Sequence, residues 1–438
     1  SSPNMALHSE DKSFAQRVQD SVPVPGLRLL MLKTNAKDIV TITGSFLGGD
    51  MFSPSREPML AEMTVRMLDE GTLRHSKEQI SEALESVGAS LSFGCGKGRV
   101  SLSAACLKKD VPLVLDLLAE QLREPAFPEA NLETDRKRLL TSLEQKKEEA
   151  GTLAFRRLME ILYPEGHPNY IPDLQKDIAS AGRIAVQDIR SFFGDTFGLG
   201  SFILSVAGDS EPDRVRALVE KSFSGFKKSP LVLPKVEPAG KPERSMTEYI
   251  TIPEKTSTSV RISSLLGITQ EHPDYFPLAV AIHVLGGGFS SRLIQTVREE
   301  RGLTYGIYAG IGGDDSKTDA YWMVSGTFAP ALLAQGMEAT MAEIDRWAVK
   351  GISAKEVEDA KTAITGGYVV GLATTAGLSG AMLGSVQDWE TIEFMDSFPG
   401  IINAITPDQV NEVIKKYIDP QRIVTVIAGS VDKEGKPL

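Results

Sequence analysis

The chain has 438 residues, of which 42% are hydrophobic and 24% are charged, a composition typical of a folded protein with room for more than one core. Its 47 basic side chains are outnumbered by 58 acidic ones, and the net charge of −11 argues against nucleic acids and anionic membranes as partners. No apolar run approaches the roughly 18–20 residues that a membrane-spanning helix needs.

The first residues, beginning Ser1-Ser-Pro-Asn-Met, show no signal-peptide pattern. Such a start is compatible with a processed terminus. We therefore expect a periplasmic or secreted protein if an export signal has been removed, and a cytoplasmic one otherwise.

Five segments of the first half have the apolar and β-branched composition of strands. Between the second and third, the segment 60–72 is expected to contain a helix. Glu62 and Arg66 then lie at i and i+4 in the order that favours an ion pair, worth about 0.2–0.5 kcal/mol. The five predicted strands are Leu27–Leu32, Ile39–Phe46, Ser90–Cys95, Arg99–Cys106 and Phe202–Ala207.

The two cysteines of the chain, Cys95 and Cys106, fall on consecutive predicted strands of a hairpin. If residues 95 and 99 face each other across that hairpin, Cys106 faces Gly88, so the two thiols are not neighbours. We expect two unpaired, buried thiols, and the cysteines do not indicate a compartment.

A proline-rich segment separates the two halves, with prolines at positions 230, 234, 238 and 242. Proline at this density keeps the backbone extended, at about 3.1 Å per residue. We interpret residues 227–246 as a linker between an N-terminal domain, 1–226, and a C-terminal domain, 247–438.

The two halves repeat one plan at nearly one offset, a pattern that indicates duplicated structural units. Val40-Thr41-Ile42 recurs as Val260-Arg261-Ile262, and the segment 127–139 recurs at 352–364. The segment 186–208 recurs without a gap at 407–429. Three matches in the same order predict two homologous domains.

The second half contains five further predicted strands and two clear helix starts. Ser353 with Glu356, and Thr406 with Gln409, are spaced as capping boxes. Hairpins followed by long helices predict an α+β fold in which each half is an antiparallel sheet covered by helices on one face. The strands are Tyr249–Ile252, Val260–Leu265, Thr304–Ile311, Tyr321–Thr327 and Ile423–Ala428.

The segment 290–308 brings two hydrogen-bond donors close together. Ser290 is a candidate N-cap and Gly302 a candidate C′ residue, which predicts a short helix over 291–301 with Arg298 in its last turn and Tyr305 at the start of a strand. A guanidinium and a phenol both suit a carbonyl oxygen that becomes an oxyanion, where loss of one donor typically costs about 2.7–4 kcal/mol. The alternative is a solvated helix end, where cations favour the helix dipole, followed by a half-buried aromatic.

Three glycines and an aromatic precede that helix: Gly286, Gly287, Gly288 and Phe289. No phosphate-loop or dinucleotide fingerprint is complete there. The glycines indicate a close backbone approach, either to the neighbouring sheet or to an extended peptide, so all four residues are candidate substrate-binding residues. The five histidines of the chain do not stand at metal-ligand spacing.

The run from Gly286-Gly287-Gly288-Phe289-Ser290-Ser291-Arg292-Leu293 to Thr304-Tyr305 resembles the signature of the second domain of the inverzincin peptidases. This is the family of pitrilysin, insulin-degrading enzyme and mitochondrial processing peptidase. The resemblance extends over about residues 20–430 and is sharp between 285 and 308. It implies two homologous halves that face each other like a clamshell, and an Arg–Tyr pair, here Arg298 and Tyr305, that binds substrate and stabilises the transition state.

The zinc motif of that family, His-x-x-Glu-His, is absent from the chain. The matching helix is 60–72, where Glu62 and Arg66 stand at the two histidine positions and Val65 at the glutamate position. Arginine only donates hydrogen bonds and stays charged, so it cannot ligate zinc, and valine cannot act as a general base. The third ligand would fall near residues 142–144. We expect no metal in this chain.

The resemblance therefore implies a peptidase subunit that is inactive alone. Some members of the family carry the two motifs on different chains, which predicts a heterodimer with a homologous zinc-bearing subunit and an unfolded peptide as substrate. The alternative is a non-catalytic structural or peptide-binding protein, like the core proteins of respiratory complexes. An intact Arg–Tyr pair favours the first hypothesis, because a structural protein does not need it.

Overall fold

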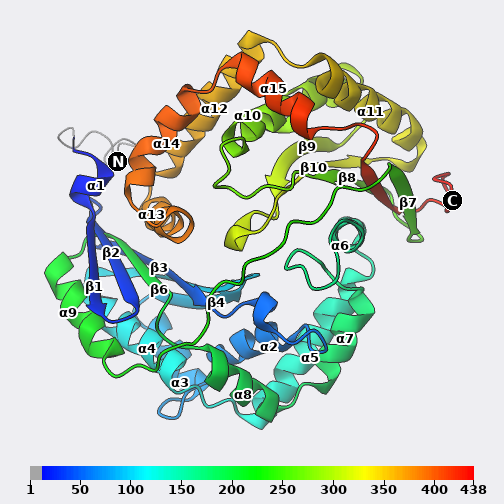
Figure 1. Ribbon diagram of the computed structural model, residues 1–438. Coiled ribbons are helices and arrows are strands. Elements are labelled where there is room, and N and C mark those ends of the chain that lie inside the picture. Colours follow the sequence, from blue (N-terminus) through cyan, green and yellow to red (C-terminus); the bar gives the residue numbers. More distant parts are fainter. Residues whose placement is uncertain (1–11) are drawn as a thin grey trace. The chain divides into compact units, whose positions relative to one another are not determined.

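A computed structural model describes residues 12–438 as two compact units (Figure 1). Unit 1 contains the chain up to Thr141 together with Asp177–Pro234 and Gly367–Phe398. Unit 2 contains Ser142–Lys176, Lys235–Gly366 and Pro399–Leu438. Each unit therefore includes a segment that the sequence boundaries 1–226 and 247–438 assign to the other half. Residues 1–11, which bear on the expected compartment, lie outside the described residues.

Unit 1 is built on a six-stranded sheet with the order β1-β2-β6-β3-β5-β4. All pairs are antiparallel except β2 with β6, which are parallel. The five predicted strands are confirmed to within one residue, and the sequence analysis missed β1. The strands are β1 (Gln19–Val24), β2 (Leu27–Lys33), β3 (Ile39–Leu47), β4 (Ser90–Cys95), β5 (Arg99–Leu107) and β6 (Phe202–Gly208).

Unit 2 is built on a five-stranded sheet with the order β7-β11-β8-β10-β9. Its one parallel pair is β7 with β11. The order matches that of unit 1 strand for strand once β1 is set aside, so the predicted repeat is a repeat of topology. The strands are β7 (Met246–Thr251), β8 (Thr258–Leu265), β9 (Gly306–Gly312), β10 (Tyr321–Phe328) and β11 (Val424–Gly429).

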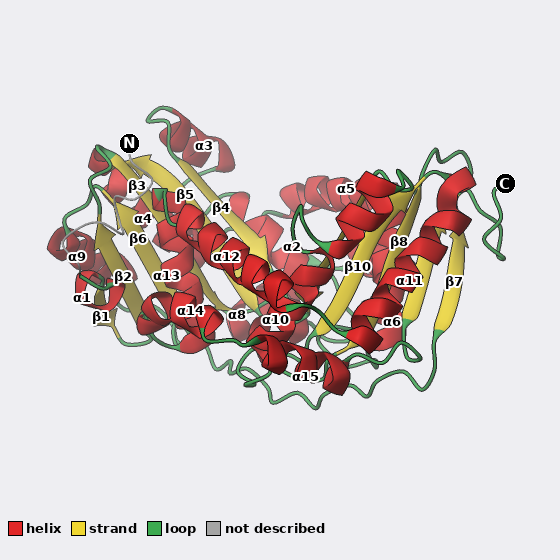
Figure 2. Cartoon of the chain, turned by 90° about the horizontal axis from the view of Figure 1, so that it is seen from above, coloured by secondary structure: helices red, strands yellow, loops and turns green. Residues whose placement is uncertain are grey.

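Helices cover both sheets, as Figure 2 shows in red and yellow. The α+β class is confirmed, but each sheet is mixed rather than purely antiparallel. Both predicted capping boxes are present, since Ser353 and Glu356 bond reciprocally, as do Thr406 and Gln409. The helices of the N-terminal half are α1 (Phe14–Arg17), α2 (Leu60–Arg66), α3 (Lys77–Glu85), α4 (Val111–Arg123), α5 (Glu129–Lys146), α6 (Ala150–Leu162), α7 (Leu174–Arg183), α8 (Val186–Thr196) and α9 (Pro212–Phe223). Those of the C-terminal half are α10 (Tyr275–Gly286), α11 (Leu333–Lys350), α12 (Ala354–Gly371), α13 (Thr375–Trp389), α14 (Glu393–Asn403) and α15 (Pro407–Tyr417).

One helix of each half packs on the sheet of the other half. Helix α13 lies on β3 and β6 of unit 1, where Leu378, Met382 and Val386 join the core cluster that contains Leu30 and Leu32. Helix α6 lies on β8 and β11 of unit 2 in the same way. Leu29 and Met31 alternate with the residues under α13 and are also buried, so helices cover both faces of the sheet of unit 1, not one.

The hairpin of β4 and β5 is confirmed, with a different register from the one expected. Cys95 pairs with Val100, and both cysteines are free. Cys106 is buried, whereas Cys95 is half-buried because it stands at the end of an edge strand.

Within residues 12–438, no single helix is both long and apolar enough to cross a membrane. Only α12 and α13 together pass that test, and they are bent by 114° where they meet.

Candidate functional site

The segment 60–72, which we expect to match the family zinc helix, contains α2, and this helix carries a salt bridge. Arg66 Nε donates to Glu62 Oε1 at 2.9 Å, which confirms the predicted ion pair. Val65, between them, is buried. Because the guanidinium already holds the carboxylate and cannot ligate, this set of donors does not fit zinc.

The surroundings of α2 are acidic. The Cys95 thiol donates to Asp50 Oδ1 at 3.3 Å. Burial raises the pKa of Asp50 to about 7. The bond from Cys95 lowers this pKa, and the nearby carboxylates of Glu62 and Asp177 raise it further.

Among the described residues, no group of three or more His, Cys, Asp or Glu side chains could hold a metal ion. Glu144, in the segment expected to carry a third ligand, forms an ion pair with Lys147 at 3.0 Å instead.

The Arg–Tyr segment of unit 2 has an unusual backbone. The predicted helix is present, but residues Ile294–Glu300 form a π-helix, a rare form that is frequent at functional sites. Gly302 ends it in the left-handed conformation, with φ +59°, as expected of a C′ glycine. Ser290 lies in the preceding turn, and the helical residues begin at Arg292.

Both donors of this segment point to solvent. Arg298, in the last turn of the π-helix, is exposed, and Tyr305 is 64% exposed. Tyr305 lies just before β9, with its backbone N–H bonded to Thr327 O at 3.0 Å, rather than within the strand as expected. Within residues 12–438, neither side chain has a hydrogen-bond or ion-pair partner, so both remain available to a ligand.

The glycines before the π-helix are required by packing. A Cβ on Gly286 would lie 2.6 Å from the backbone nitrogen of Ala309, so this glycine lets α10 approach β9. A Cβ on Gly287 or Gly288 would meet the ring of His283. Of the two expected explanations, a close approach to the neighbouring sheet therefore accounts for Gly286. Phe289 is 72% exposed and is the residue of this group that a ligand can reach.

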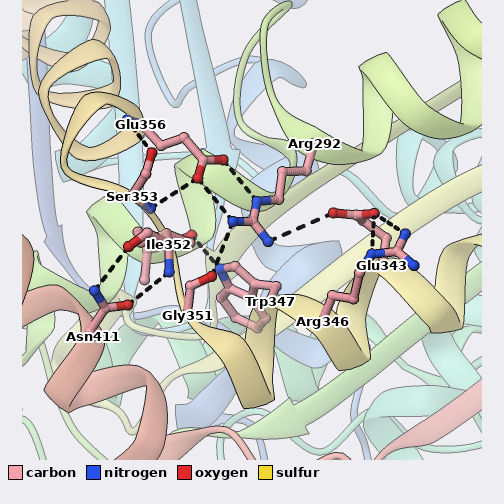
Figure 3. A network of polar contacts seen from close by, with 10 residues as sticks. Arg292, Glu343, Arg346, Trp347, Gly351, Ile352, Ser353, Glu356 and Asn411 are labelled. Atoms are coloured by element: carbon pink, nitrogen blue, oxygen red, sulfur yellow. Dashed lines mark hydrogen bonds and ion pairs between the residues drawn. The ribbon is translucent and has the colours of Figure 1, made fainter.

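A half-buried polar network fixes the start of the same segment, as Figure 3 shows. The Arg292 guanidinium donates to both carboxylate oxygens of Glu356, at 2.8 and 2.9 Å, and to Gly351 O at 3.0 Å. Glu343 of α11 lies 3.8 Å from the same guanidinium. The bonds from Arg292 hold the pKa of Glu356 at about 2, against a partial opposing effect of burial. Arg292 thus ties the π-helix to the start of α12.

Two family models match the chain. Residues 29–170 match the model of insulinase (peptidase family M16), and residues 183–364 match that of the peptidase M16 inactive domain. The chain belongs to peptidase family M16. The segment 60–72 lies in the first matched range, and Arg298 and Tyr305 lie in the second.

Several relatives align with this chain over most of its length and most of their own. The chain is 24% identical to an uncharacterized zinc protease of Streptomyces coelicolor over 85% of this chain and 81% of that protein. It is 21% identical to the non-peptidase homolog YmxG of Helicobacter pylori over 89% of each. A crystal structure of a peptidase M16 inactive domain from Pseudomonas fluorescens superposes with a TM-score of 0.85 at 25% identity, covering 96% of this chain and 100% of that chain.

Sequence reasoning missed the role of Arg292. It stands inside the M16 signature, in Ser291-Arg292-Leu293, and an arginine just before an apolar helical residue gives no sign of a distant partner. Glu356 was identified only as the end of a capping box. Because it bonds Ser353 N and Arg292 together, one carboxylate serves two structural purposes.

Proposed function

We propose that this chain is the non-zinc subunit of an M16 peptidase, and that it supplies Arg298 and Tyr305 to a homologous partner that carries His-x-x-Glu-His. The observation that carries the proposal is the state of these two side chains. Both are exposed and without partners among the described residues, while Arg292 and Gly302 fix the backbone on either side of Arg298. Folding alone does not require two unpaired donors on a π-helix held in this way.

The chemistry follows from the two donors. A peptide carbonyl oxygen gains negative charge as its carbon is attacked, and a guanidinium and a phenol that are already in place stabilise that charge without reorganisation. Arg298 also binds the ground-state carbonyl, because its charge does not depend on the reaction. Tyr305 contributes mainly where the oxygen becomes an oxyanion. Zinc and the general base belong to the partner in this proposal.

The second candidate is a non-catalytic structural or peptide-binding M16 protein. Two observations favour it: one relative is named a non-peptidase homolog, and one structural neighbour is described as an inactive domain. A protein of this kind would bind peptides or a partner subunit without any zinc-dependent cleavage. Both candidates predict that this chain does not hydrolyse peptides by itself.

The deciding experiment is co-expression with an M16 chain of the same genome that contains His-x-x-Glu-His. We expect a complex that cleaves a quenched fluorescent peptide, whereas each chain alone is inactive and this chain contains no stoichiometric zinc. A complex that forms but cleaves no faster than the zinc-bearing chain alone would support the second candidate. Zinc-dependent cleavage by the isolated chain would contradict both.

A further inference from the structure

A row of three polar side chains crosses the sheet of unit 2. Ser325 on β10 stands directly opposite Arg261 on β8 and, on its other side, directly opposite Tyr308 on β9. Residues directly opposite each other on neighbouring strands project to the same face of a sheet. Since β9 is an edge strand, the row runs from the interior of the sheet to its open edge.

Arg261 carries a charge that has no counter-ion among the described residues. Its Nη1 donates to the carbonyl oxygen of the preceding Val260 at 3.0 Å, and no carboxylate lies within ion-pair distance. A Cβ on Gly151 would lie 2.8 Å from Nη2, which places the end of the guanidinium against the first turn of α6. That turn is itself the positive end of a helix dipole. Glu149, at the same turn, accepts from the Thr152 hydroxyl at 2.8 Å instead.

Ser325 carries a hydroxyl that has no partner. The residue is 2% exposed, and among residues 12–438 its oxygen forms no hydrogen bond. Leaving a buried polar group unsatisfied costs about 1–3 kcal/mol. A half-buried guanidinium without an anion therefore stands next to a buried hydroxyl without a partner, and a single anionic acceptor would satisfy both.

The corresponding row of unit 1 lacks these features. The repeat places Thr41 at the position of Arg261, and Thr41 faces Ala105, which in turn faces Ser90. The Thr41 hydroxyl is bonded to that of Thr375, at the start of α13, at 2.8 Å. In unit 1 the same positions hold a threonine with a neutral hydrogen bond and an alanine. The fold therefore does not require the unpaired charge that unit 2 carries at this position.

We propose that Arg261 and Ser325 bind a carboxylate group of an extended peptide that enters from the β9 edge beside Tyr308. The planar fork of a guanidinium matches a carboxylate, and Ser325 adds a neutral donor. Gly306 and Gly310 flank Tyr308 on the same face, and a Cβ on either would meet nothing within 4 Å, so this part of the strand is open to another backbone. Tyr308, the register partner of Ser325 on the edge strand, is 60% exposed.

The test is fluorescence polarisation on the full chain alone, with a fluorescein-labelled alanine–serine decapeptide that has one central glutamate and a free C-terminus. Three companion peptides carry glutamine in place of the glutamate, an amidated C-terminus, or both. Loss of binding with the glutamine or with the amide identifies which carboxylate is bound. We expect the doubly neutral peptide to bind roughly 10- to 100-fold more weakly.

The protein variants separate the proposed site from general charge effects. Arg261→Thr and Ser325→Ala install the residues of the unit 1 row and should each weaken binding, Arg261→Thr at least about 10-fold. Ser325→Ala tests the proposal without risk to the fold, because its hydroxyl has no partner to lose. Arg422→Met, which removes a surface guanidinium paired with Asp419, should leave binding unchanged.

The inference is overturned if all four peptides bind equally, if no peptide binds at millimolar concentration, or if Arg261→Thr and Ser325→Ala both bind as the wild type does. It stands apart from the proposed function, because it requires neither a partner chain nor cleavage. Arg298→Ala and Tyr305→Phe should leave the affinity difference between the charged and the doubly neutral peptide unchanged, even if they weaken all four peptides equally or abolish activity in the complex.

Discussion

The two units differ most in the helical segment that precedes an edge strand, β4 in unit 1 and β9 in unit 2. In unit 1, α2 ends in the Glu62–Arg66 pair, and α3 leads into β4 as an ordinary α-helix that begins with a Ser76–Gln79 capping box. In unit 2, α10 leads through the glycines to a π-helix and then to β9. Both connections end at a left-handed glycine, with φ +65° at Gly88 and +59° at Gly302. Because the topology is shared, the fold itself does not require the irregular backbone or the exposed donors of unit 2.

The units resemble each other in that a helix from the other half of the chain packs on each sheet. The largest effects on stability are expected from substitutions in these two helices. Met382 of α13 and Leu158 of α6 are both fully buried against their sheets. Met382→Ala and Leu158→Ala should each lower the free energy of unfolding by about 2–5 kcal/mol, because each leaves a cavity in a packed core. Urea denaturation measures both, with the exposed Val349→Ala as a control that should change stability by less than about 0.5 kcal/mol. Tolerance of one substitution but not the other would show that the exchange is structural in only one unit.

The second largest effect concerns the donors that only unit 2 presents. In a reconstituted complex, Tyr305→Phe removes one hydroxyl with little change in volume, so assembly should survive. If the phenol stabilises the oxyanion, kcat should fall by about 10²- to 10³-fold with a smaller effect on KM. Arg298→Ala should lower kcat and raise KM.

The measurement is steady-state kinetics on a quenched peptide, with Tyr249→Phe on the opposite edge strand, β7, as the matched control. A Tyr305→Phe complex with unchanged kcat would remove the phenol from the mechanism. It would leave unit 2 as a binding surface, in agreement with the second candidate function.

Much of this comparison could be read from the sequence, because it depends on local patterns. Strand alternation located ten of the strands, capping boxes located helix starts, and the repeat predicted two units of one topology. The exchange of α6 and α13 could not be predicted, since an apolar helix face does not specify which sheet covers it. The π-helix was also missed, because its residues have the composition of any short helix. The repeat aligns Arg261 with Thr41, but the sequence does not show that Arg261 has no counter-ion, because that depends on which side chains surround it in the folded protein.

The network that anchors the π-helix is expected to produce an intermediate, pH-dependent effect. The folded-state pKa of Glu356 is about 2, below its ordinary value of 4.5, and the first cause is its bond from Arg292. A lowered carboxylate pKa contributes stability that is present above pH 4.5 and is lost as the pH falls toward 2. Because the pair is partly exposed, Glu356→Gln should cost only about 1–2 kcal/mol at pH 7.

Urea denaturation at pH 7 and at pH 3 measures this effect, and the difference between wild type and Glu356→Gln should shrink at the lower pH. The surface pair Lys355–Asp359, on the same helix, provides the control, since Asp359→Asn should change little at either pH. An equal cost at both pH values would show that Glu356 acts as the cap of α12 and not through the charge of Arg292.

The smallest effect is expected at the position where the zinc motif of the family would stand. Glu62→Ala and Arg66→Ala each break an i, i+4 pair on a half-exposed helix face, so each should cost less than about 1 kcal/mol of stability. Glu62→Ala should be the milder of the two, because it also removes one carboxylate from beside Asp50, whose pKa the charge of Glu62 raises. Neither variant should change the activity of the reconstituted complex. A loss of cleavage with Arg66→Ala, together with normal cleavage by Tyr305→Phe, would reverse the assignment and place the functional residues of this chain in unit 1.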